Sequence, residues 1–185
     1  DWQFMIATLS AITMVVGNLI ALQQTNIKRL MAYSSIGQVG YMLMGITALS
    51  PAVTSALLLH MTGYVVTNVC AFTAIIAYHN ATGAEEIRDF RGMSDRAPLL
   101  AAVTAVAMFS LAGMPLFAGF LTKFIFFQSV AENHYYWLAG VAVVSSFISL
   151  YYYLQVLRVA YVNTAPDSSR FHVPLIKKDA VVLLA

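Results

Sequence analysis

The sequence has 185 residues, of which 60% are hydrophobic and only 10% are charged, and its formal net charge is +2. Because a water-soluble domain of this length carries about a quarter charged residues, this composition excludes an ordinary soluble fold. Nearly all basic residues lie between apolar segments and form no single patch, so we expect no nucleic-acid partner. Runs without Asp, Glu, Lys or Arg cover residues 2–27, 30–84 and 97–122, and apolar runs longer than about 18 residues are typical of transmembrane helices.

These runs predict an all-α fold, a polytopic bundle of transmembrane helices in the lipid bilayer. Ser50 followed by Pro51 is typical of a helix start, with Ser as the N-cap and Pro in the first turn. Residue 1 is Asp and the last apolar run is cut off, so we interpret residues 1–185 as a fragment of one transmembrane domain of a longer protein. The predicted spans are about 2–22, 30–49, 52–79, 97–131 (broken) and 135–162, and a sixth span begins at about 178.

The distribution of Lys and Arg predicts the orientation of the chain. Nine of the ten basic residues lie in or next to the turns after the first, third and fifth spans, and the turns near Ser50 and Glu132 contain none. Because short cytoplasmic loops are enriched in Lys and Arg, we expect the odd-numbered turns in the cytoplasm and Asp1 outside. The nine are Lys28, Arg29, Arg88, Arg91, Arg96, Arg158, Arg170, Lys177 and Lys178.

The segment at 97–131 does not fit a single upright helix. As a straight helix it would be about 52 Å long, whereas the hydrocarbon core of a bilayer is about 30 Å thick. Pro115 has no N–H to donate to the carbonyl of Leu111, and its ring clashes with that turn. We therefore predict two half-helices that meet at membrane depth near residues 113–115, a feature typical of transporters. A simple proline kink in one tilted helix is the alternative.

The tenth basic residue, Lys123, lies in this segment, nine residues before Glu132. This separation is about 13 Å along a helix, which makes it difficult for the amine to reach the headgroups. A lysine near the bilayer centre costs about 2.5–3.5 kcal/mol on insertion scales. Because burial disfavours a charged amine, Lys123 is a candidate for taking up and releasing a proton. The alternative is a packing lysine that partly reaches the membrane surface.

A polar stripe follows one face of the third predicted span. His60, Tyr64 and Asn68 are spaced at i, i+4 and i+8, so they stack on one helix face. Histidine titrates near neutral pH, and with hydroxyl and amide neighbours it can hold a chain of water, so His60 is a second candidate for proton transfer. For Tyr64 and Asn68 the alternative is hydrogen bonding between membrane helices. The single cysteine, Cys70, has no Cys-x-x-Cys neighbour, so we expect no iron–sulfur cluster on this chain.

Two motifs resemble one known family. Residues 24–41, Gln-Thr-Asn-Ile-Lys-Arg-Leu-Met-Ala-Tyr-Ser-Ser-Ile-Gly-Gln-Val-Gly-Tyr, resemble the signature of the antiporter-like subunits of respiratory complex I and of cation/proton antiporters. Residues 110–124 resemble that family's discontinuous helix with its buried lysine. The lysine followed by Phe124, together with Leu-Tyr-Tyr-Tyr-Leu at 150–154, is most similar to the N-type subunits of NADH-quinone oxidoreductase. His60, in contrast, matches a histidine of a sibling antiporter-like subunit.

The resemblance implies a fold of two inverted five-helix repeats, in which this chain is the second repeat and the start of one further helix. It implies a proton-translocating membrane subunit of NADH:quinone oxidoreductase that couples quinone reduction to proton transfer through buried groups, with Lys123 as the ionisable group. From the residues themselves we add His60 as a second proton-transfer residue, with Tyr64, Asn68, Gly113 and Pro115 as supporting residues. The chain itself would hold no redox catalytic residue, no cofactor and no metal. Its partners would be the lipid bilayer and the other membrane-arm subunits, which would bind quinone and NADH.

Two other functions fit the same residues. One is a subunit of an Mrp-like sodium/proton antiporter, which shares the motifs and has no peripheral redox arm. The other is a structural membrane scaffold in which Lys123 only pairs with a buried carboxylate. The resemblance implies a multi-pass protein of a bacterial plasma membrane, with the thylakoid membrane as the alternative.

Overall fold

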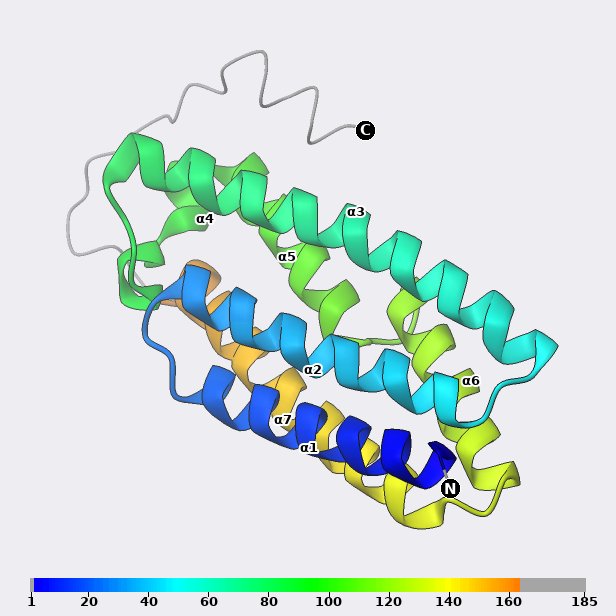
Figure 1. Ribbon diagram of the computed structural model, residues 1–185. Helices are drawn as coiled ribbons and strands as arrows, with labels where there is room; N and C mark the ends of the chain where they lie inside the picture. Colours follow the sequence, from blue (N-terminus) through cyan, green and yellow to red (C-terminus); the bar gives the residue numbers. More distant parts are fainter. Residues whose placement is uncertain (1, 164–185) are drawn as a thin grey trace.

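The computed structural model describes residues 2–163, which form a bundle of α-helices without a β-strand (Figure 1). This part of the chain confirms the predicted all-α bundle, and the sixth predicted span, from about residue 178, lies outside it. In chain order the helices are α1 (Trp2–Leu22), α2 (Ile27–Thr47), α3 (Pro51–Thr82), the short 3-10 helix η1 (Ile87–Phe90), α4 (Met93–Arg96), α5 (Pro98–Ala112), α6 (Ala118–Glu132) and α7 (Tyr136–Tyr161).

The bundle has the surface of a membrane protein. Helices α1, α3 and α7 are each long and apolar enough to cross a bilayer. Large hydrophobic side chains cover their outer faces, and Leu58, Met61 and Val65 of α3 are each more than half exposed. An apolar surface of this extent is unfavourable in water and is the kind that lipid chains cover. The chain is therefore a multi-pass membrane protein.

Capping side chains place the starts of two helices. Helix α2 begins three residues before the predicted span, because the side chain of Asn26 accepts the backbone N–H groups of Lys28 and Arg29 at 3.0 and 3.2 Å. Residues 27–29, which precede the predicted span, thereby form the first turn of the helix. At α3, the Ser50 hydroxyl accepts the N–H of Val53 at 3.2 Å, as predicted for the Ser-Pro start.

Helices α1 and α2 pack closely because small residues line their contact. A Cβ atom on Gly17 would lie 2.7 Å from the backbone nitrogen of Gly37, and one on Gly40 would lie 2.8 Å from that of Met14. The close approach lets the Ser10 hydroxyl donate to the carbonyl of Gly40 at 2.8 Å. These glycines therefore form the packing surface between the two helices.

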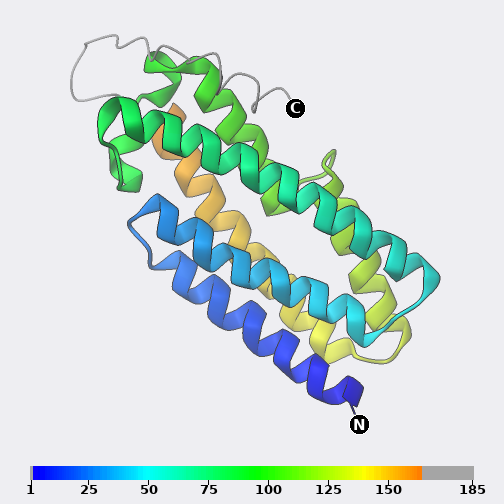
Figure 2. The same cartoon turned by 45° about the horizontal axis from the view of Figure 1, so that its top comes forward.

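The predicted break in the fourth apolar segment is confirmed. Helix α5 ends at Ala112 and α6 begins at Ala118, so the alternative of a single kinked helix is wrong. The physical reason is Gly113, whose φ of +78° turns the chain out of the helix just before Pro115. Figures 1 and 2 both place the connecting loop about halfway along α3, within the length of the bundle.

At one end of the bundle, the turn between α1 and α2 is joined to the loop that follows α3. The N–H of Ile27 donates to the carbonyl of Glu85 at 3.2 Å, and the N–H of Ile87 donates to that of Thr25 at 2.8 Å. Lys28 lies 3.9 Å from the carboxylate of Glu85. This end contains the basic turns that we expect in the cytoplasm, and it also holds η1 and α4, two short helices that the sequence did not predict.

Candidate functional site

The candidate site begins at the end of α5. The N–H groups of Gly113 and of the residue after it donate to the carbonyls of Phe109 and Ser110, which closes the last turn of the helix. The carbonyl of Leu111 receives no backbone N–H in the described residues, because the residue four positions later is Pro115. The break therefore leaves one strong acceptor inside the bundle, and such a group requires a partner from elsewhere.

Lys123 provides one partner for this carbonyl. Its side chain is 3% exposed, and its Nζ donates to the carbonyl oxygen of Leu111 at 3.1 Å. The same nitrogen lies 4.6 Å from the centre of the Tyr41 ring, a distance at which a cation interacts favourably with the ring face. None of the ion pairs among the described residues involves Lys123. The amine is thus held by a carbonyl dipole and an aromatic ring, and no carboxylate within residues 2–163 pairs with it.

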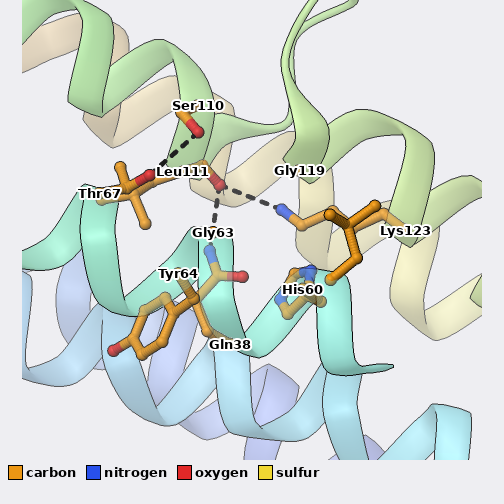
Figure 3. Close-up of a pocket in the computed structure, with 10 residues that line it drawn as sticks. Gln38, His60, Gly63, Tyr64, Thr67, Ser110, Leu111, Gly119 and Lys123 are labelled. Atoms are coloured by element: carbon orange, nitrogen blue, oxygen red, sulfur yellow. Dashed lines mark hydrogen bonds between the residues drawn. The ribbon is translucent and has the colours of Figure 1, made fainter. Parts of the chain in front are cut away.

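Gln38 of α2 provides the second partner. Its side chain is buried, and its Nε2 donates to the carbonyl oxygen of Leu111 at 3.0 Å. A carbonyl oxygen has two lone pairs, so both donors can bind it at once. Figure 3 shows Lys123 and Gln38 reaching Leu111 from different directions. Three helices, α2, α5 and α6, therefore meet at one backbone oxygen.

His60 of α3 lines the same cavity as Lys123. Its ring is buried, and Nδ1 lies 2.7 Å from the hydroxyl oxygen of Thr122, the neighbour of Lys123 in sequence. The ring centre is 5.5 Å from that of Phe126. The second ring nitrogen, Nε2, has no hydrogen-bond partner in the described part of the chain. A buried imidazole nitrogen without a partner is a site where a water molecule or a proton can bind.

The remaining predicted residues of α3 lie around or beside the same cavity. Its volume is about 20 Å³, which is enough for a water molecule. Thr67 and Ser110 both line it and are hydrogen-bonded to each other, with their hydroxyl oxygens 3.3 Å apart, and Asn68 donates to the hydroxyl of Tyr64 at 3.2 Å. Tyr64 lines the cavity, whereas Asn68 does not. The lining residues are Gln38, Leu59, His60, Gly63, Tyr64, Thr67, Ser110, Leu111, Gly119 and Lys123 (Figure 3).

The structure thus brings Lys123, His60 and Tyr64 to one cavity at the break. Asn68 does not line this cavity and contacts it only through its hydrogen bond to Tyr64. Sequence reasoning missed Gln38 and Tyr41. Both belong to the motif at 24–41, and a glutamine within an apolar run was the available signal. The sequence signal did not show which face of α2 contacts Lys123.

The amine lies between two kinds of surroundings. Polar side chains from α2, α3 and α5 line the cavity beside it. Further along α6 toward Glu132, buried apolar side chains predominate, and the buried residues Thr47 and Ser129 lie among them. The buried apolar group includes Met44, Phe126, Val130 and Leu138.

Comparison with known proteins agrees with this arrangement. The family model for the transmembrane part of NADH:quinone oxidoreductases and Mrp antiporters matches residues 1–149. NADH-quinone oxidoreductase subunit N of Moorella thermoacetica is 43% identical over 169 residues, which cover 91% of this chain and 36% of that protein. A chain of respiratory complex I from Thermus thermophilus, solved with bound aureothin, is 34% identical with a TM-score of 0.76, and the match covers 97% of this chain and 40% of that one.

The fold also matches a chain of the Mrp complex from a Dietzia species, with a TM-score of 0.84 and 24% identity over 95% of this chain and 34% of that one. The chain spans about a third of the length of the curated relatives that it matches. The family match covers most of the described residues, including the broken helix and Lys123. The chain therefore belongs to the family of NADH:quinone oxidoreductase and Mrp antiporter transmembrane proteins.

Proposed function

We propose that this chain is part of a proton-translocating membrane subunit of NADH:quinone oxidoreductase, of the subunit N type, and that Lys123 carries the proton. The 43% identity to a subunit N and the 34% identity to a chain of respiratory complex I support this choice within the family. Because the chain spans about a third of such relatives, the activity belongs to the complete subunit in its complex.

The observation that carries the proposal is the state of the Lys123 amine. It is buried at a helix break and bound to a backbone carbonyl without a counter-ion among the described residues. A structural lysine in a membrane interior is stabilised by an acidic partner, whereas an amine held only by neutral groups can exist with or without its proton. The amine is a donor in both states, so the bond to Leu111 survives the change.

In the proposed cycle, the ammonium form of Lys123 releases one proton toward one side of the membrane and becomes a neutral amine. The neutral amine then takes up one proton from the other side, so each cycle moves one proton and leaves the side chain unchanged. His60 passes the proton to or from the amine. Tyr64, whose hydroxyl accepts a hydrogen bond from Asn68, holds the water that connects the two groups, and the break formed by Gly113 and Pro115 keeps the Leu111 carbonyl available.

The energy for this cycle comes from quinone reduction in other subunits. In this proposal the chain binds no cofactor and no metal, and quinone and NADH bind elsewhere in the complex. Its partners are the other subunits of the membrane arm and the surrounding lipid. The membrane is the bacterial plasma membrane.

Replacement of Lys123 tests the proposal directly. In Lys123→Ala, the complete complex should assemble, while proton pumping per NADH oxidised in inverted membrane vesicles falls by about a hundredfold, the usual contribution of a positioned proton-transfer group. Lys28→Ala is the matched control, since Lys28 is a partly exposed residue in the first turn of α2. Normal pumping with coupled quinone reduction in Lys123→Ala would contradict the proposal, and full activity in Lys123→Met would favour a structural scaffold.

The second candidate is a subunit of an Mrp-like antiporter, because the family model covers both classes and the fold matches an Mrp complex. The two candidates differ in their energy source. An antiporter in sealed vesicles exchanges sodium for protons down an imposed pH gradient without any redox substrate. Sodium-dependent exchange under these conditions, together with purification free of redox subunits, would favour the antiporter.

A further inference from the structure

Gln38 has no role in the transfer cycle described above, although it binds the same oxygen as Lys123. The two donors lie 3.0 and 3.1 Å from the carbonyl oxygen of Leu111, and both side chains are buried. They come from different helices, α2 and α6, and meet at the end of a third, α5. This is a specific arrangement, because the oxygen is available only as a result of Pro115.

The arrangement has a consequence for movement of the lysine. If Lys123 were the single partner of this carbonyl, departure of the amine would leave a buried acceptor without a hydrogen bond, which is costly. With Gln38 in place, the oxygen keeps one hydrogen bond after the amine has left. The lysine can then bind and leave the carbonyl at a lower energetic cost.

We propose that Gln38 is a positioning residue for proton transfer: it holds the carbonyl of Leu111 in place and satisfied, so that the amine of Lys123 can bind and leave. This inference rests on the proposed function. Tyr41, one turn after Gln38 on α2, supports the same geometry, because its ring lies 4.6 Å from the amine. Helix α2 therefore supplies both the ring beside the lysine and the amide that holds its acceptor.

Replacement of Gln38 by Glu is the most direct test, because Glu has nearly the same shape. An ionised carboxylate cannot donate to Leu111 and instead pairs with the nearby ammonium, which favours the protonated lysine. We expect the curve of proton pumping against pH to move by about one unit to higher pH. The titratable groups around the amine are His60 and Tyr64 of α3, Tyr41 of α2 and, next to Gln38, Tyr153 of α7, and α5 contains none.

Gln38→Leu removes the amide and keeps a comparable volume. We expect pumping per assembled complex to fall by about fivefold, the factor that one ordinary hydrogen bond is worth. The matched control is Ser10→Ala, which removes a buried hydrogen bond between α1 and α2 that does not involve the carbonyl of Leu111. It should keep normal pumping per complex and an unchanged pH curve.

The outcomes separate this inference from the proposed function. Normal pumping in Lys123→Ala would overturn both. If Lys123→Ala stops pumping while both Gln38 variants behave like Ser10→Ala, only the inference on Gln38 fails. A loss in Gln38→Glu that is equal at every pH would also overturn it, since that is the result of a purely structural role. Should Gln38→Leu not assemble, Gln38→Glu decides alone.

Discussion

At the scale of single residues, the site depends on what Pro115 removes. A helix that continued through this point would bind the carbonyl of Leu111 to the N–H four residues later. Proline supplies no N–H, and the carbonyl is bound instead by side chains from two other helices. The functional group of Leu111 is thus its backbone oxygen, which explains why inspection of side-chain types along the sequence did not single it out.

Gly113 provides a prediction at this scale, because it combines two requirements. Its φ of +78° is unfavourable for a residue with a Cβ atom, and a Cβ there would lie 3.2 Å from Cδ and 3.4 Å from Nζ of Lys123. We expect Gly113→Ala to cost about 1–2 kcal/mol of stability through the backbone and, in addition, to reduce proton pumping by crowding the amine. Pumping per assembled complex is the measurement.

Gly83 offers a matched control for that variant. It has almost the same backbone angle, φ +76°, and no atom lies within 4 Å of the position of its Cβ. Gly83→Ala should therefore cost similar stability and leave pumping per complex normal. Equal pumping in the two variants would show that the space beside Lys123 is not important.

At the scale of helices, much of the fold could be predicted from the sequence. The broken helix was predictable because segment length and proline chemistry lead to the same answer. The starts of α2 and α3 depend on local capping, and only the Ser-Pro pair was clear enough to place one of them. The contact of Gln38 and Tyr41 with the lysine could not be predicted, because a helix with apolar residues on every face does not show which face points inward.

The contact between α1 and α2 leads to a prediction for these helices. A Cβ on Gly40 would lie 2.8 Å from the backbone nitrogen of Met14, which is too close for the present packing. We expect Gly40→Ala to push the helices apart and to reduce stability by about 1–3 kcal/mol. The measurement is the thermal unfolding of the full-length protein in detergent.

Gly140→Ala is the control, because no atom lies within 4 Å of the position of its Cβ on α7. There the change should be neutral or slightly stabilising, since Ala is the better helix former. Similar losses in both variants would contradict a special role for the contact between α1 and α2.

At the scale of the whole molecule, the two ends of the bundle differ in charge. The end that we expect in the cytoplasm holds the basic turns, and the turns at the other end contain no Lys or Arg. Between the two ends, Lys123 lies beside the polar cavity and near the buried apolar group that contains Phe126. The difference in charge between the two ends is the basis for the expected orientation.

The orientation itself can be tested by labelling. In a Cys70→Ala background, Ser94→Cys in α4 should react with a membrane-impermeant thiol reagent added to the cytoplasmic side. Asn133→Cys, in the turn between α6 and α7, should react when the reagent is added outside. The reverse pattern in intact cells and inverted vesicles would overturn the assignment from Lys and Arg.

The division of the fourth apolar segment also has a consequence for biogenesis. Helices α5 and α6 contain 15 residues each, so each is about 22 Å long and shorter than the hydrocarbon core. Because each half is too short to span the bilayer alone, we expect residues 98–132 to enter the membrane together as one hydrophobic unit. The apolar neighbours of the lysine would then offset the cost of its insertion.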